Sequence, residues 1–225
     1  MNIRIPIFFI GLFLHHISGA QSNLEVGSLP AINLNSDLGN GYRLNFKWES
    51  RQIIESVSEA DANRVNFVLS DFSAIVSKKV DLRSSIAGGY LIRFEGDAVI
   101  HRTIQQFALV RRLTGIRIGH RFASDQTFGK KEDFSFRLRY RLTGEFPLSG
   151  QEVDNKEFYL KVNNEYLNAF ERNSYDFEIR LVPSMGYLFT DKNKLEAGLD
   201  YRIDSFVNGT AVSNLWLAIS WYIKL

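Results

Sequence analysis

Residues 134–143 read Phe-Ser-Phe-Arg-Leu-Arg-Tyr-Arg-Leu-Thr, with an apolar residue at every even position and a polar or charged residue at every odd position. In an α-helix, alternate residues lie about 200° apart around the axis, so Arg137, Arg139 and Arg141 would point to opposite sides. In a β-strand they share one face, and the apolar residues share the other. The stretch therefore predicts a two-faced β-strand.

The same period of two recurs along the chain. Residues 42–49, 195–204 and 215–225 alternate clearly. Weaker strand patterns lie near 64–76, 80–94, 98–110, 114–127, 157–168 and 176–189, with a further candidate at 29–36. Clusters of Gly, Asn and Asp separate them, as is typical of turns. Residues 52–62 suggest a short helix within a loop. The sequence predicts an all-β domain built as a meander of hairpins.

The number of strands bears on the expected topology. The patterns give about eleven, whereas single-chain bacterial outer-membrane barrels have an even number, with both termini on the periplasmic side. Either residues 29–36 do not pair, which gives ten strands, or two strands have been merged, which gives twelve. We therefore expect a single antiparallel up-and-down transmembrane β-barrel of about 10–12 strands.

The N-terminus has the features of a secretory signal peptide. Arg4 precedes an apolar run at residues 5–14, and the small residues 18–20 provide a cleavage site after Ala20. The apolar run is shorter than the ~20 residues of a membrane-spanning helix. We therefore expect a signal peptide at residues 1–20 and one barrel domain at residues 21–225. Because the chain has no cysteine, disulfides and a cysteine-linked lipid anchor are excluded.

Composition narrows the class of partner. The chain has 27 Lys and Arg against 25 Asp and Glu, and loss of Arg4 with the signal peptide would leave a net charge of +1. Such a balance gives no reason to expect nucleic acid as a partner. A hydrophobic fraction of 45% is too high for a mainly disordered chain.

Two arguments place the apolar face against lipid. Side chains can fill a barrel of eight strands, so ten or more strands around an apolar lumen would leave a large void. Bulky aromatic residues toward strand ends also resemble the girdles found at membrane interfaces; they are Trp48, Tyr140, Tyr201, Trp216, Trp221 and Tyr222. We expect a monomer in the cell outer membrane, in contact with outer-membrane lipid and inserted by the barrel-insertion machinery.

The opposite face would then form a charged lumen. The expected lumenal charge network comprises Arg117, Arg121, Asp125, Arg137, Arg139, Arg141, Glu165, Arg180, Glu196, Asp200 and Arg202. Like charges on neighbouring strands repel, so these arginines need carboxylates within reach. Asp125, Glu145 and Glu165 are the nearest candidates by strand order. The network either braces the barrel or forms a surface that binds an anion or another substrate.

Four stretches resemble the domain-of-unknown-function family 2490. They are residues 120–128 (HRFASDQTF), 136–142 (FRLRYRL) and 163–167 (NNEYL), and Arg180 ahead of Gly186-Tyr187. The resemblance implies an outer-membrane β-barrel of a Gram-negative bacterium, without an established activity. The family pattern also implies an Arg-x-Arg-x-Glu series on the strand after residue 114. Arg121 and Asp125 match it, whereas Ala123 and Thr127 stand in place of arginines. The chain also ends in Leu225 instead of the aromatic residue usual in barrel proteins.

No catalytic, metal or cofactor site is expected. Outside the signal peptide the only histidines are His101 and His120, too few for a histidine-rich metal site. His120 shares a strand face with Ser124 but not with Asp125, which argues against a triad. We expect a non-enzymatic protein that is structural or forms a narrow pore for small solutes. The alternatives are a lipid or acyl-ester hydrolase at the barrel rim that uses His101 or His120, and a soluble periplasmic barrel that binds an apolar ligand.

Overall fold

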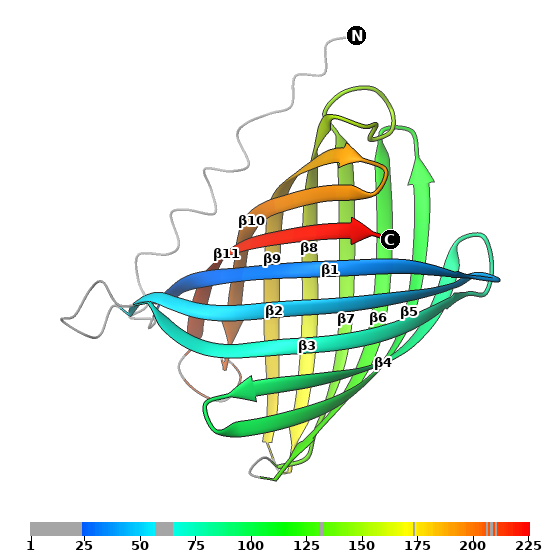
Figure 1. Ribbon diagram of the computed structural model, residues 1–225. Helices are drawn as coiled ribbons and strands as arrows, with labels where there is room; N and C mark the ends of the chain where they lie inside the picture. Colours follow the sequence, from blue (N-terminus) through cyan, green and yellow to red (C-terminus); the bar gives the residue numbers. More distant parts are fainter. Residues whose placement is uncertain are drawn as a thin grey trace.

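Eleven β-strands among the described residues close into one barrel in the computed structural model (Figure 1). The structure describes residues 24–56, 65–130, 133–172, 174–205, 207, 209 and 211–225. The strands are β1 (Leu24–Gly39), β2 (Tyr42–Ser56), β3 (Asn66–Lys79), β4 (Ser84–Glu95), β5 (Ala98–Leu113), β6 (Ile116–Gly129), β7 (Ser135–Pro147), β8 (Glu157–Glu171), β9 (Ser174–Thr190), β10 (Asn193–Asp204) and β11 (Val212–Lys224). The expected signal peptide lies outside the described residues.

The barrel closes through a parallel strand pair. Each strand is antiparallel to its neighbours in sequence, but β1 and β11 run in the same direction, from the pair Leu24–Ser213 to the pair Asn35–Lys224. With an odd number of strands, the first and the last must be parallel. The predicted all-β barrel of about 10–12 strands is confirmed, but its wholly antiparallel pairing and the choice between ten and twelve strands are wrong. β1 begins at the rim opposite to the one where β11 ends.

Two local predictions have different outcomes. The candidate strand at 29–36 is confirmed, because it forms the middle of β1 and pairs with both β2 and β11. Residues 52–56 continue β2 instead of starting a helix, and residues 57–62 lie outside the described part of the chain. No helix among the described residues is long and apolar enough to cross a membrane.

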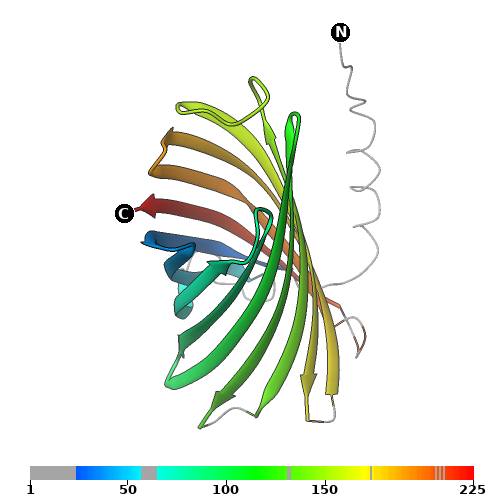
Figure 2. The same ribbon diagram turned by 90° about the vertical axis from the view of Figure 1, so that its right-hand side faces the viewer.

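Among the described connections, two-residue turns join β1 to β2, β4 to β5, β5 to β6 and β9 to β10. The tight turn between β1 and β2 uses Gly39, Asn40 and Gly41, whose φ angles are 79°, 52° and 79°. Glycine and asparagine tolerate this left-handed conformation better than other residues. Figure 1 shows β1, β2 and β3 crossing in front of the steeper β6–β9, and Figure 2 shows the same tilted strands from the side.

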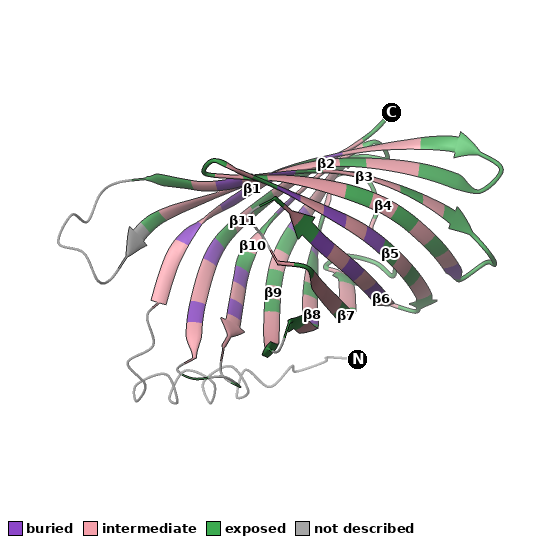
Figure 3. Cartoon of the chain, turned by 90° about the horizontal axis from the view of Figure 1, so that it is seen from below, coloured by how far each residue is buried: buried purple, intermediate pink, exposed green. Residues whose placement is uncertain are grey.

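The alternating pattern separates the two sides of the barrel wall. Arg137, Arg139 and Arg141 line the lumen, while Leu138 on the same strand is 44% exposed on the outer wall. Figure 3 shows the resulting bands of buried and exposed positions along the strands. Two of the expected girdle aromatics are exceptions: Trp216 is 2% exposed, and Tyr222 lines the lumen. Their positions in the alternation of β11 place them inside.

Candidate functional site: the charged lumen

The lumen holds a cavity of ≈ 270 Å³. Side chains from β1 to β11 contribute to its lining, and among the described residues eleven are basic and five are acidic. The basic ones are Lys47, Arg51, Arg93, Arg102, Arg121, Arg137, Arg139, Arg141, Lys161, Arg180 and Arg202; the acidic ones are Glu49, Asp71, Glu165, Glu196 and Asp200. More than half of the residues that line this cavity are therefore charged, and most of the charges are positive.

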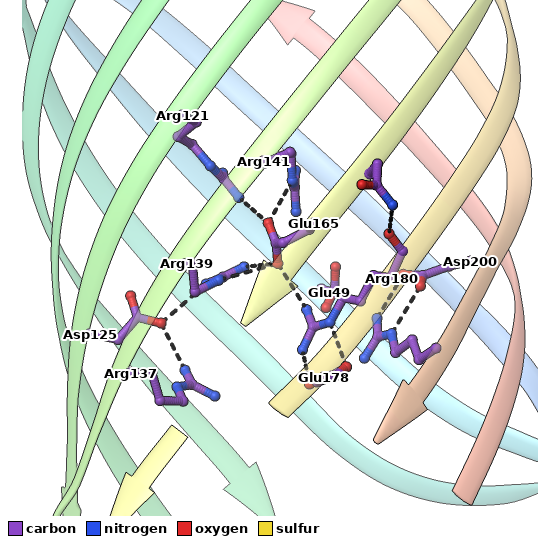
Figure 4. Close-up of polar contacts among 12 residues, drawn as sticks. Glu49, Arg121, Asp125, Arg137, Arg139, Arg141, Glu165, Glu178, Arg180 and Asp200 are labelled. Carbon is purple, nitrogen blue, oxygen red and sulfur yellow. Dashed lines mark hydrogen bonds and ion pairs between the residues drawn. The ribbon is translucent and has the colours of Figure 1, made fainter. Parts of the chain in front are cut away.

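Glu165 on β8 is the centre of this network (Figure 4). Its Oε2 accepts hydrogen bonds from Arg121 at 2.8 Å and from Arg141 at 2.6 Å. Its Oε1 accepts from Arg139 at 2.8 Å and from Arg180 at 3.5 Å. Glu165 is 1% exposed. Four guanidinium groups therefore surround one buried carboxylate.

The strand register explains this convergence. Cross-strand pairing puts Arg121, Arg141, Glu165, Arg180 and Arg202 in one row across β6 to β10. Neighbouring like charges in such a row repel one another. The single carboxylate at the centre offsets much of this repulsion, so the row depends on Glu165.

Asp125 on β6 extends the network from Arg139 to Arg137. It is 0% exposed, and its Oδ2 accepts hydrogen bonds from Arg137 at 2.9 Å and from Arg139 at 3.1 Å. Arg139 consequently bridges Asp125 and Glu165. Seven of the residues that the sequence pointed to are joined here: Arg121, Asp125, Arg137, Arg139, Arg141, Glu165 and Arg180.

The other four predicted residues lie in separate contacts. Arg202 forms two hydrogen bonds with Asp200, at 2.9 and 2.7 Å, on the same strand. Glu196 accepts hydrogen bonds from Lys161 at 2.7 Å and from Lys194 at 3.1 Å, and the Tyr159 hydroxyl donates one to it at 2.8 Å.

Arg117 differs from the other predicted residues because its side chain is 47% exposed. It contacts Glu145 at 3.4 Å.

Sequence reasoning missed the lumenal charges of β2 to β5. Arg93 forms two 2.8 Å hydrogen bonds with its cross-strand partner Asp71, and Lys47 pairs with Glu49. The alternation of residues 42–49 was a signal that could have placed Lys47 and Glu49 in the lumen. Near Asp71 and Arg93 the pattern is too irregular to assign a face.

Two arginines of the lumen, the buried Arg102 and the half-buried Arg51, have no described carboxylate within 4.0 Å. Arg102 on β5 is 7% exposed, and its Nε donates to the hydroxyl of Thr127 at 2.9 Å. Arg51 on β2 lies over the Trp216 ring, 5.1 Å from its centroid. Both side chains line the lumenal cavity, so both present positive charge that is not paired directly with a described carboxylate.

The two histidines among the described residues lie on strand faces opposite to those of the lumenal arginines Arg102 and Arg121, and each contacts a tyrosine. The Nδ1 atom of His101 is 2.9 Å from the Tyr90 hydroxyl, and that of His120 is 2.9 Å from the Tyr140 hydroxyl. Ser124 donates to Gln105 instead of to a histidine. The described residues contain no group of three or more His, Cys, Asp or Glu side chains that could hold a metal ion.

The fold and its interior define a class of protein: a closed, mixed eleven-stranded β-barrel with a charged lumen. The pattern of the family described as "Protein of unknown function (DUF2490)" matches residues 29–212. The chain therefore belongs to this family, as the resemblance in sequence predicted. No curated protein and no solved structure matches the chain.

Proposed function

We propose that this protein is a monomeric, non-enzymatic outer-membrane β-barrel, exported by a signal peptide at residues 1–20 and inserted by the barrel-assembly machinery. The observation that supports this most directly is the distribution of side chains across the barrel wall. Apolar side chains lie outside and charged ones inside, which is the opposite of the distribution in a soluble barrel. Phe46 and Phe122 are 51% exposed on the outer wall, and Trp221 is 49% exposed. Soluble monomers rarely expose extended apolar surfaces, whereas lipid-facing barrel walls consist of them.

A soluble barrel that binds an apolar ligand fits the structure less well. Such a barrel needs an apolar lumen to bury its ligand, but this lumen contains the network around Glu165 and Asp125. The outer polar side chains also do not converge on a hydrolytic site, since His101 and His120 each face a tyrosine. Neither alternative gains a supporting observation.

The network also bears on what passes through the barrel. Ion pairs from β6, β7, β8 and β9 meet within the lumen, and the cavity left beside them is ≈ 270 Å³. The protein is accordingly proposed to be a structural element or a narrow pore. Its conductance in planar bilayers should be small or absent, and large porin-like steps would contradict a braced lumen.

Localisation is tested by fractionating cells that express the full-length protein. We expect the mature chain in the outer-membrane fraction, with a gel mobility that changes on heating, as is usual for intact barrels. Recovery in the detergent-free periplasmic fraction would contradict the proposal. If the lumen conducts, replacing Arg137, Arg139 and Arg141 together by alanine should remove any anion selectivity.

A further inference from the structure

Arg102 is a buried cation whose terminal nitrogens have no hydrogen-bond partner among the described residues. Its Nε is satisfied by Thr127, and its guanidinium faces the lumenal cavity. Asp71 and Asp125 attract it from a distance, but Arg93 and Arg137 repel it. A buried charge without a close partner is costly in a protein interior.

The neighbouring carboxylates are already engaged. Both oxygens of Asp71 accept from Arg93, and Asp125 Oδ2 is shared by Arg137 and Arg139. Among the fully buried side-chain atoms of the described residues, Asp125 Oδ1 is the one acceptor without a partner, whereas the Nε groups of Arg51, Arg121 and Arg137 are donors without one. The described lumen therefore has more unused donors than unused acceptors.

The numbers of charged side chains also indicate an excess of positive charge in the lumen. Eleven basic and five acidic side chains line the cavity. Lys194, Asp125, Glu178 and Glu95 contact those residues from outside the lining, which brings the totals to twelve basic and eight acidic groups. A surplus of about four positive charges remains in this described cluster. Such a surplus favours a bound anion of more than one charge.

We propose that the lumen binds a small polyvalent oxyanion of the phosphate type, with Arg102 as its main ligand and with Arg93 and Arg137 beside it. The guanidinium group suits this role because its N–H donors match pairs of phosphate oxygens. A cavity of ≈ 270 Å³ has room for such an ion together with water. This inference goes beyond the proposed function, because it depends on the lumen and not on insertion into a membrane.

The test uses the mature full-length barrel, refolded in a neutral detergent at low ionic strength, with inorganic phosphate as the probe. Isothermal titration calorimetry should show saturable binding. Arg102→Gln should weaken it by about tenfold or more, since a charged hydrogen-bond partner is lost. The phosphate affinity of Arg102→Lys should lie between those of the parent and Arg102→Gln, because lysine keeps the charge but lacks the paired N–H donors of the guanidinium group. The matched control is Arg111→Gln, an exposed arginine on the same strand, which should bind phosphate like the parent.

A second measurement needs no variant and covers the case in which Arg102→Gln does not fold. Phosphate that binds the folded barrel should raise its thermal unfolding midpoint above that in sodium chloride of equal ionic strength. Absence of saturable binding and of this stabilisation would overturn the inference, as would equal affinities for the Arg102→Gln and Arg111→Gln proteins. Failure of membrane insertion would leave these measurements in detergent unaffected, so the two proposals fail separately.

Discussion

Trp216 of β11 packs over Gly27 of β1, its direct partner across the parallel seam that closes the barrel. A Cβ atom at Gly27 would lie 2.3 Å from the Trp216 ring, so only glycine leaves room for the indole. The ring is 2% exposed, and the Arg51 guanidinium lies 5.1 Å from its centroid. The seam is therefore held by side-chain packing as well as by backbone pairing.

Replacing Trp216 by alanine should weaken this closure. Truncating a buried tryptophan typically costs about 3–5 kcal/mol, and here it also removes the contact with Arg51. The measurement is the free energy of unfolding in urea, followed by tryptophan fluorescence in detergent. Trp221→Ala is the control, since Trp221 lies on the same strand but is 49% exposed on the outer wall. Equal losses in the two variants would show that the seam has no special dependence on Trp216.

Glu165→Gln should be the most damaging isosteric change in the lumen. It leaves Arg121, Arg139, Arg141 and Arg180 without their shared anion, and removing one partner of a buried ion pair costs about 3–5 kcal/mol. The expected result is a clear drop in the unfolding free energy and in the temperature of the heat-dependent gel shift. Glu171→Gln, an exposed position on the same strand, should change neither. A Glu165→Gln protein as stable as the parent would mean that solvent already screens the network.

Alternation alone could predict that Arg137, Arg139 and Arg141 share one face of the wall, because period two is unbroken in β7; that this face is the lumenal one needed the argument from barrel size. It could also predict that Asp125 and Glu165 contact them, since neighbouring strands must compensate charge. The patterns also gave about eleven strands, which is the number in the structure. The expectation of ten or twelve came from the even-number rule for outer-membrane barrels, and the parallel pairing of β1 with β11 follows from the odd count.

Arg102 could not be assigned to the lumen for a different reason. The outer positions of β5 include polar residues such as Thr103 and Gln105, which hydrogen-bond to Gln126 on β6. The inner positions include the apolar Ile100 and Ile104, which are 7% and 5% exposed. With both faces mixed in polarity, period two carries no information about orientation, and only the register fixes it.

Gly186→Ala should disturb the contact between Tyr159 and Glu196. The two residues Tyr159 and Gly186 face each other across β8 and β9, and a Cβ at Gly186 would lie 2.1 Å from the Tyr159 ring. Overpacking of this kind costs about 1–3 kcal/mol. Unfolding in urea measures the loss. Gly88→Ala is the matched control, because nothing lies within 4 Å of its added Cβ; it should leave stability unchanged or slightly raised. Similar losses at both glycines would point to a general intolerance of strand substitutions.

The turn between β3 and β4 offers a test at low pH. Asp81 Oδ2 accepts a hydrogen bond from the Ser84 hydroxyl at 2.6 Å, and Oδ1 accepts one from the Ser84 amide at 2.8 Å. These hydrogen bonds, first that of the hydroxyl, hold the pKa of Asp81 below the 3.8 of an unperturbed aspartate. Because the folded pKa is the lower one, the stabilisation of the turn is present above pH 3.8 and is lost as the pH falls through the folded pKa.

Ser84→Ala removes the hydroxyl donor, so the pKa of Asp81 should rise toward 3.8. Carbon-detected NMR of the Asp81 carboxyl during an acid titration measures this directly, without reference to global unfolding. The neighbouring substitution Ser85→Ala serves as the control, since the structure shows no hydrogen bond between Ser85 and Asp81, and it should leave the titration curve in place. An unchanged curve in Ser84→Ala would mean that the backbone amides of Arg83 and Ser84 alone set the ionisation of this turn.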